Sequence, residues 1–134
     1  MADNLKIGDS ATLTKAFSSE EVNEFAKLSL DNNPIHLDED FATASMFGQR
    51  IVHGMLVASL FSGLLGQKLP GVGSIYLGQK LSFKVPVIIG EEVTASVEII
   101  DIRNDKPIVT LKTVCANQAG KTVIDGEAVV MIPR

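Results

Sequence analysis

The chain has 134 residues, of which 46% are hydrophobic, and it carries a formal net charge of -4. This apolar fraction excludes a disordered chain and predicts one domain that spans residues 1–134. Twelve Lys and Arg residues stand against sixteen Asp and Glu residues, a balance that argues against a broad nucleic-acid-binding surface or a footprint on an anionic membrane.

A single cysteine, Cys115, excludes both an internal disulfide and a zinc site built from cysteines. The first ten residues lack an apolar core and carry acidic residues where a signal peptide carries basic ones. The longest apolar stretch runs from Ile51 to Gly66 and is shorter than the roughly 20 residues that a membrane-spanning helix needs. We therefore expect a cytoplasmic protein without a membrane segment.

The first half of the chain predicts a strand, a helix and a long loop. Residues 11–17 alternate in the manner of a short strand. Ser18 and Glu21 have the spacing of a capping box, which opens a helix that extends toward Leu30. The Asp-Asn-Asn-Pro run at 31–34 ends this helix, because a residue before proline is pushed toward extended conformations. A loop then continues to about residue 52.

Residues 54–67 are apolar around nearly the whole helical circumference, so this helix must be enclosed by other elements. The second half of the chain supplies the enclosure, because four segments show the two-residue period of strands with one buried face. These segments run over about 75–85, 93–99, 108–115 and 124–132. The order of elements predicts an α+β hot-dog fold, in which an antiparallel sheet of about five strands wraps around a central apolar helix.

The predicted fold also has consequences for assembly. A single unit leaves the edges of the sheet open and encloses a site in the long loop poorly. We therefore expect at least a homodimer.

The only two histidines, His36 and His53, lie in or beside the long loop, near Asp31 and Asp38. The loop can fold back so that Asp31 and His36 converge on one small molecule. The alternative is an ordinary helix-ending turn with His36 at the surface. A metal site built from the four residues is disfavoured, because their spacing matches no known ligand pattern.

Small residues mark one face of the apolar helix. Gly54 lies at its start, where backbone amides have no internal partners, so this amide can donate to an oxygen that gains negative charge. The alternative is that glycine only eases the loop into the helix. Gly54, Ala58, Ser62 and Gly66 recur every four residues. Such a stripe usually packs against a strand; alternatively it leaves room for an acyl chain, with the Ser62 hydroxyl orienting a catalytic carboxylate.

Several separated motifs resemble the R-specific enoyl-CoA hydratases of the MaoC-like dehydratase family. The resemblance begins with DNNPIH at 31–36, followed by Phe41-Ala42 and by RIVHGM at 50–55. It continues through SLFSGLLGQ (59–67), LGQKLSFKVPVIIGEEV (77–93) and GEAVV (126–130), and so covers nearly the whole chain. Leu30 departs from the family, whose members often carry a small or acidic residue just before the aspartate.

The resemblance implies an enzyme that adds water to a trans-2-enoyl-CoA to give the (R)-3-hydroxyacyl-CoA, with no cofactor and no metal. This reaction links fatty-acid β-oxidation to the supply of hydroxyacyl-CoA. Carried over to this sequence, Asp31 and His36 would hold one water, with Asp31 as the base. The Gly54 amide would hold the thioester oxygen, Ser62 would orient the Asp31 carboxylate, and Asn33 would shape the loop.

Substrate contacts follow from the same resemblance. Leu65 and Val130 are candidates for the acyl pocket, because both lie in the apolar segments. The phosphates of CoA need cations, for which the candidates are Lys68, Lys80, Lys84 and Arg103. These four residues are otherwise ordinary solvated surface charges.

Three rival functions remain for a hot-dog protein. Hot-dog thioesterases commonly use an acidic residue on the central helix, and the acyl-carrier-protein dehydratases pair a histidine with a carboxylate from that helix. Residues 54–67 contain no acidic residue, which weighs against both. A non-catalytic acyl-CoA-binding domain is disfavoured by the presence of both Asp31 and His36.

Overall fold

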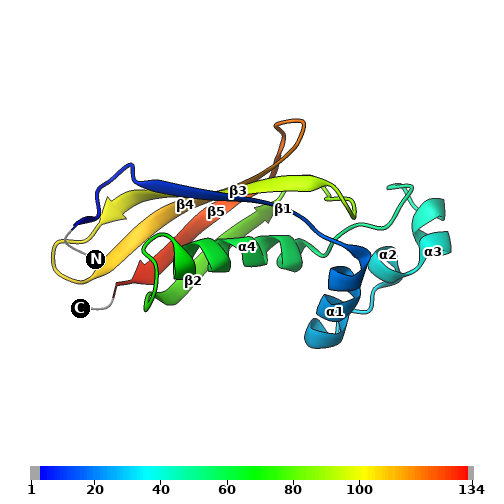
Figure 1. The fold of residues 1–134 in the computed structure, drawn as a ribbon, viewed down its shortest axis with the longest axis horizontal. Coiled ribbons are helices and arrows are strands. Elements are labelled where there is room, and N and C mark those ends of the chain that lie inside the picture. Colours follow the sequence, from blue (N-terminus) through cyan, green and yellow to red (C-terminus); the bar gives the residue numbers. More distant parts are fainter. Residues whose placement is uncertain (1–3, 133–134) are drawn as a thin grey trace.

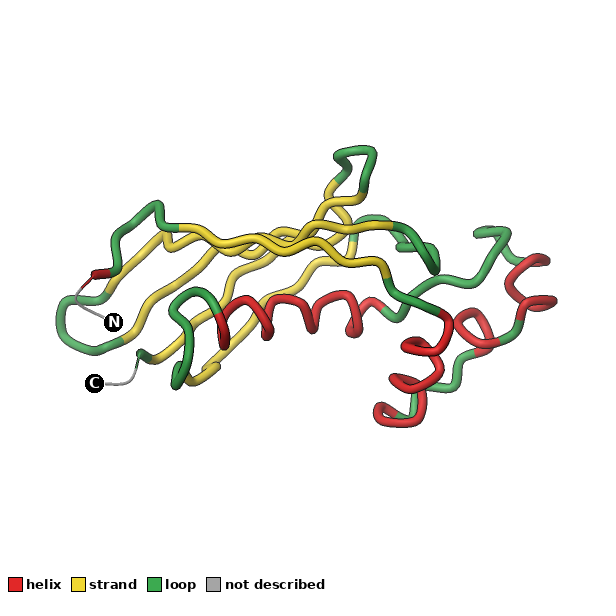
Figure 2. Tube along the Cα trace, viewed as in Figure 1, coloured by secondary structure: helices red, strands yellow, loops and turns green. Residues whose placement is uncertain are grey.

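The computed structural model describes residues 4–132. Along the chain the elements are β1 (Ser10–Ala16), α1 (Ser19–Ser29), α2 (Pro34–Leu37), α3 (Glu39–Ala44), α4 (Gly54–Gln67), β2 (Ile75–Phe83), β3 (Glu92–Ile102), β4 (Ile108–Asn117) and β5 (Thr122–Met131). The strands form one antiparallel sheet in the order β1-β3-β4-β5-β2, and α4 lies along one face of it (Figure 1). The short helices α1, α2 and α3 gather beyond the first turn of α4 (Figure 2). The predicted α+β hot-dog fold is confirmed.

Local signals explain how the helices begin. The Ser18 side chain accepts a hydrogen bond from the Glu21 amide, and the Glu21 carboxylate accepts one from the Ser18 amide, as the capping box predicts. The long loop, by contrast, contains two short helices that the sequence analysis did not predict. α1 ends at Ser29, where Leu30 adopts the left-handed conformation, and Pro34 instead begins α2, because its fixed φ suits the first position of a helix.

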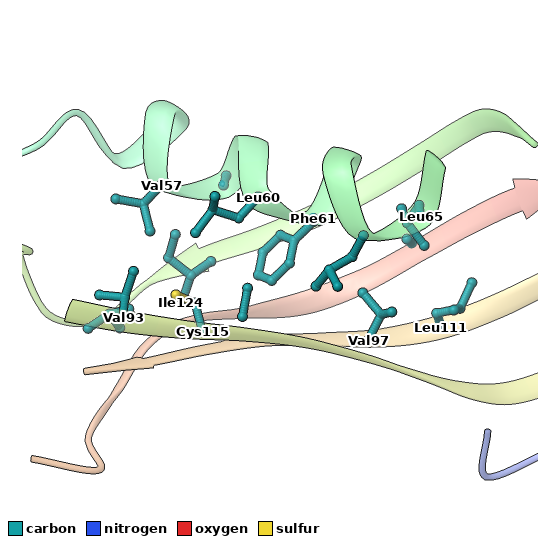
Figure 3. Close-up of a cluster of buried hydrophobic side chains, with 14 of the residues drawn as sticks. Val57, Leu60, Phe61, Leu65, Val93, Val97, Leu111, Cys115 and Ile124 are labelled. Carbon is teal, nitrogen blue, oxygen red and sulfur yellow. The ribbon is translucent and has the colours of Figure 1, made fainter. Parts of the chain in front are cut away.

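The core lies between α4 and the sheet. The inward-facing residues of β3 are completely buried, as the alternating pattern predicts, and they are Val93, Ala95, Val97 and Ile99. Leu60 and Phe61 point from α4 toward this layer (Figure 3). Cys115 belongs to the same layer, and burial raises the pKa of its thiol to about 11. None of the helices within residues 4–132 combines the length and apolarity required to span a bilayer.

The expectation that α4 is enclosed on all sides is wrong for one chain. The sheet covers one face of the helix, whereas Met55, Ser59, Ser62 and Gly63 on the other face are exposed. The neighbouring edge strand β2 is open as well, and its predicted apolar face is only partly buried. A register shift between Tyr76 and Gly78 interrupts the alternation of β2.

Candidate active site

A pocket of about 420 Å³ opens where the first turn of α4 meets the loop that carries the histidines. Its polar lining includes Asp31, His36, His53 and Gly54. The structure therefore brings together the three groups predicted to do the chemistry, which are the carboxylate, the imidazole and the amide at the start of α4. Phe47 and Phe83 contribute to its apolar walls.

Asp31 lies just past the end of α1, in a turn that its own side chain stabilises. Its amide donates to the Ser29 hydroxyl at 3.1 Å, and its Oδ1 accepts a hydrogen bond from the Asn33 amide at 3.2 Å. The Asn33 side chain in turn accepts from the Ile35 amide at the start of α2. These contacts are the ones expected of an asparagine that shapes the loop, and they leave Asp31 exposed to the pocket.

His36 lies on α2 and is buried. Its Nδ1 is 2.8 Å from the carbonyl oxygen of Ile51. Because a carbonyl oxygen only accepts hydrogen bonds, Nδ1 must carry a proton. In the neutral ring Nε2 therefore presents a lone pair, and in the charged ring it presents a second proton. This fixed orientation suits a group that exchanges protons through Nε2.

The Asp31 carboxylate and a ring nitrogen of His36 lie within 4.8 Å of each other. Two hydrogen bonds of about 2.8 Å that meet at a water molecule span about 4.5 Å when the angle between them is roughly tetrahedral. A separation within this limit is compatible with one bridging water between the two side chains.

His53 contacts both members of this pair. Its Nε2 donates to the backbone carbonyl of Asp31 at 3.1 Å, and its ring stacks on His36 with 3.9 Å between centroids. Phe25 meets the His53 ring edge-on at 4.9 Å. Nδ1 of His53 is buried and has no hydrogen-bond partner within residues 4–132. Burial lowers the pKa of His53, and the adjacent His36 ring lowers it further, against the opposing effect of the bond to Asp31.

The geometry of the two imidazoles disfavours a metal site. One atom each of Asp31, His36 and His53 lies within 4.8 Å of the others, a spacing that would suit an ion. The two rings, however, are inclined by only 24°. Imidazole lone pairs lie in the ring plane, so those of two stacked rings lie in separate, nearly parallel planes and do not converge on one ion. One nitrogen of each ring also donates to a carbonyl.

Gly54 is the first residue of α4 and follows His53 at the N-cap. Its amide has no acceptor within the described part of the chain, as expected for the first turn of a helix. A Cβ added at Gly54 would lie 2.7 Å from the Phe83 ring. Glycine is therefore needed here if the aromatic ring is to keep its place beside a free amide.

The remaining small residues of α4 line two further cavities instead of packing tightly against a strand. A cavity of about 480 Å³ is lined by Ala58 and Ser62, and one of about 80 Å³ by Ser62 and Gly66. Leu65 and Val130 line the smaller cavity, so the structure brings these two predicted acyl-pocket residues together. Tyr76, to which the sequence analysis assigned no role, lines both cavities.

Ser62 does not reach Asp31 within one chain. It lies eight residues beyond Gly54, which is about 12 Å along a helix, and it does not line the pocket that contains Asp31. The expected contact between the Ser62 hydroxyl and the Asp31 carboxylate is therefore absent from the single chain. Ser62 is instead on the exposed face of α4.

The four candidate cations for CoA are spread over the molecule. Lys84 lines the pocket, and Lys80 lies on the adjoining strand β2. Lys68 follows the last turn of α4, where its Nζ donates to the carbonyl of Thr12. Arg103 lies in the turn between β3 and β4, at the end of the sheet remote from α1 to α3, and pairs with Asp105 at 2.7 Å (Figure 1). The structure thus places Lys84, but neither Lys68 nor Arg103, at the pocket.

The sheet, its central helix and the paired carboxylate and imidazole define a hot-dog protein with an acid–base site in the loop before that helix. The family model for the MaoC like domain matches residues 4–119. The chain belongs to the MaoC-like dehydratase family.

Individual relatives agree with this assignment. The chain is 58% identical to the (R)-specific enoyl-CoA hydratase of Aeromonas caviae over 132 residues, which cover 98% of each protein. It is 48% identical to the (R)-specific enoyl-CoA hydratase of Rhodospirillum rubrum, over 98% of this chain and 90% of the relative. Among solved structures, the (R)-hydratase from A. caviae involved in PHA biosynthesis superposes with a TM-score of 0.96 at 58% identity, over 97% of this chain and 98% of that one.

Proposed function

We propose that this protein is an (R)-specific enoyl-CoA hydratase, which adds water to trans-2-enoyl-CoA and also catalyses the reverse dehydration. The observation that carries the proposal is the meeting of the Asp31 carboxylate and the His36 imidazole, within 4.8 Å, beside the free amide of Gly54. The relatives named (R)-specific enoyl-CoA hydratase, 58% and 48% identical to the chain, support it.

In the proposed mechanism, Asp31 and His36 hold one water between them. The oxygen of this water bonds to C3 of the enoyl group while the water gives one proton to the Asp31 carboxylate. The His36 Nε2–H gives its proton to C2, and the proton held by Asp31 then passes to Nε2, so that both groups return to their starting protonation states. The bond from the His36 Nδ1–H to Ile51 keeps the ring in place and directs Nε2 to the reaction.

Negative charge develops on the thioester oxygen as the water attacks C3. The Gly54 amide lies at the positive end of the α4 dipole and meets this charge. A donor of this kind supplies about 2.7–4 kcal/mol of transition-state stabilisation in enzymes that stabilise an oxyanion.

The proposed substrate is a CoA thioester whose acyl chain enters the cavity between α4 and β2. Leu65 and Val130 would limit the length of this chain, and Lys84 at the pocket would contact a CoA phosphate. The product would supply hydroxyacyl-CoA from β-oxidation intermediates, in line with the PHA biosynthesis named for the A. caviae structure. A cytoplasmic location is part of the same proposal.

The test uses purified protein and crotonyl-CoA. Hydration removes the enoyl absorbance, whereas a thioesterase releases free thiol, and chiral analysis of the product must give the R isomer. Asp31→Asn and His36→Ala should reduce turnover by about 10⁴-fold or more while the protein stays folded. Asp38→Asn is the matched control, because Asp38 caps α3 through the Phe41 amide and asparagine caps equally well. Full activity in both dyad variants would refute the proposal.

We also propose that the protein is a homodimer formed through the open face of α4 and the edge strand β2. Large apolar side chains are exposed together on these elements: Met55 (59%), Ile75 (52%), Leu77 (47%) and Phe83 (52%). Exposed apolar surface of this kind marks an interaction site, and β2 offers unpaired backbone groups along its outer edge. Ser62 lies on the same open face, so a second copy of the chain packed there would bring the Ser62 hydroxyl to a catalytic carboxylate.

Light scattering after size-exclusion chromatography measures the oligomeric state of the protein and so tests the proposed homodimer. Leu77→Asp should shift the protein toward the monomer and reduce activity. Ile7→Asp is the control, because Ile7 is also exposed (67%) but precedes β1 at the opposite edge of the sheet. A monomeric wild-type protein would exclude this assembly without affecting the assignment of Asp31 and His36.

A further inference from the structure

Arg50 is a buried cation whose guanidinium binds two elements of the site. Arg50 is only 8% exposed to solvent. Nε donates to the carbonyl oxygen of His36 at 2.6 Å. The two terminal nitrogens donate to the Ser19 hydroxyl at 2.9 Å and to the Asn23 side-chain oxygen at 3.0 Å, both on α1. One side chain thus joins α1, which leads into Asp31, to α2, which carries His36.

The acceptors of Arg50 are unusual for a buried charge. Its closest carboxylate is that of Glu39, 3.8 Å away and largely exposed. Taking a guanidinium out of water costs free energy that neutral acceptors repay only when the geometry is good. The bond to His36 is short, as is typical of hydrogen bonds with an ionised donor. This carbonyl belongs to the last turn of α2, where no helical partner is available.

The backbone of Arg50 is anchored on the segment that connects β2 to β3. Its carbonyl accepts from the Ile89 amide, and the next residue, Ile51, forms a bridge with Ile88. Ile51 also accepts the hydrogen bond from the His36 ring. The segment 50–51 therefore holds His36 at two points, the ring through Ile51 and the main chain through Arg50.

From these contacts we propose that Arg50 is a positioning residue that fixes the separation between Asp31 and His36 by tying α2 to α1. Arg50 is not among the residues that line the pocket, so it acts through His36 and does not touch the substrate. The proposal rests on the proposed hydratase function, because its kinetic consequence is the placement of the bridging water.

The guanidinium is suited to this task in a way that lysine is not. Arginine presents five donors in a rigid planar fork, whereas the lysine ammonium is a point charge that cannot span three acceptors on two helices. A displacement of about 1 Å in a catalytic group costs up to about 100-fold in rate. Arg50→Lys should therefore lower kcat by about 10- to 100-fold and change KM by less than about threefold.

Two variants of α1 distinguish a loss of positioning by Arg50 from a general loss of stability. Ser19→Ala combined with Asn23→Ala removes the α1 acceptors of Arg50. Ser18→Ala removes the N-cap of the same helix, which destabilises it, and leaves Arg50 untouched. Both changes should lower the melting temperature. Only the Ser19/Asn23 variant should lower kcat, with KM nearly constant.

The experiment compares kcat and KM for crotonyl-CoA in wild type, Arg50→Lys, the Ser19/Asn23 variant and Ser18→Ala. It also records the His36 imidazole signals by ¹⁵N NMR, where a loosened ring exchanges its Nδ1 proton faster. Lower kcat together with a changed His36 signal in the first two variants supports the proposal. Unchanged kcat in both, or an equal loss in Ser18→Ala, overturns it. If Arg50→Lys does not fold, the comparison of the Ser19/Asn23 variant with Ser18→Ala decides whether Arg50 is a positioning residue. If the wild-type protein is inactive, the hydratase function fails, and the His36 signal alone decides the role of Arg50.

Discussion

The rings of His36 and His53 stack face to face, with centroids 3.9 Å apart and planes inclined by 24°. The same His53 ring donates to the backbone carbonyl of Asp31. It therefore contacts both proposed catalytic residues and immediately precedes the Gly54 amide. This arrangement requires a neutral His53, because a charged ring would be buried against the proposed acid–base histidine. Burial, and after it the charge of His36, lower the pKa of His53, in keeping with this requirement.

Titration of His53 should make stability depend on pH. The pKa of His53 lies below its unfolded value of about 6.5, so the unfolded state binds more protons between the two values. The free energy of unfolding should therefore be highest above about pH 6.5 and fall as the pH drops toward the folded pKa. Urea unfolding between about pH 5 and 8 measures this slope.

His53→Gln is the matched variant for the pH experiment. Glutamine keeps a donor for the Asp31 carbonyl but cannot titrate in this range. We expect the variant to be less stable than wild type at every pH and to lose part of the decline below about pH 6.5. Equal slopes in the two proteins would show that the pKa of His53 does not change on folding, and would overturn this prediction.

Gly54→Ala should impair catalysis by moving an aromatic ring. The added Cβ would lie 2.7 Å from the Phe83 side chain, which must shift within the pocket. A displacement of about 1 Å near the reacting atoms lowers kcat/KM by up to about 100-fold. Gly63→Ala is the control on the same helix, because its added Cβ meets nothing within 4 Å in the single chain; since Gly63 lies on the proposed dimer face, the oligomeric state of this variant is measured alongside its activity. Full activity of Gly54→Ala would contradict the proposed close approach, whereas partial rescue by Phe83→Leu would support it.

The parts of the fold that were predictable are those with a strong local signal. The capping box of Ser18 and Glu21, the extent of α4 and the buried faces of β3 and β5 each follow from spacing along the chain. The open face of α4 was not predictable, because hydropathy shows that a helix is apolar but does not show how many copies of the chain cover it.

The residues of the candidate site were also predictable only in part. The motifs at 31–36 and 50–55 pointed to Asp31, His36 and Gly54, which meet in one pocket. Nothing in the sequence indicated that Arg50 would be buried against His36, because its acceptors lie 14 to 31 positions away along the chain. The contacts of Arg50 depend on how α1 and α2 pack together. Ser62 and Arg103 were assigned by similarity or by charge alone, and neither similarity nor charge shows how far a residue lies from the site.

Leu30 should gain stability when it is replaced by glycine. It ends α1 with a φ of 66°, in the left-handed region that costs roughly 1 kcal/mol or more for a residue with a Cβ. Leu30 is 81% exposed, so little packing is lost when its side chain is removed. Leu30→Gly should raise the free energy of unfolding by about 0.5–1 kcal/mol, measured by urea unfolding. Leu30→Ala, which keeps the Cβ, should not. A loss of stability in Leu30→Gly would indicate that the leucine side chain is covered in the assembled protein.

The smaller cavity between α4 and β2 should set the preferred acyl length. It measures about 80 Å³ and includes Leu65 and Val130 in its lining. Leu65→Ala enlarges it, so kcat/KM for octenoyl-CoA relative to crotonyl-CoA should rise by about tenfold or more, since one methylene in an apolar pocket is worth about 10- to 200-fold. Leu65→Val should shift the ratio in the same direction by less. Leu60→Ala is the control, because Leu60 is buried on the same helix but lines neither of the two cavities beside Ser62. Both alanine variants should lose about 2–5 kcal/mol of stability. An unchanged ratio in Leu65→Ala, or the same shift in Leu60→Ala, would place the acyl chain elsewhere.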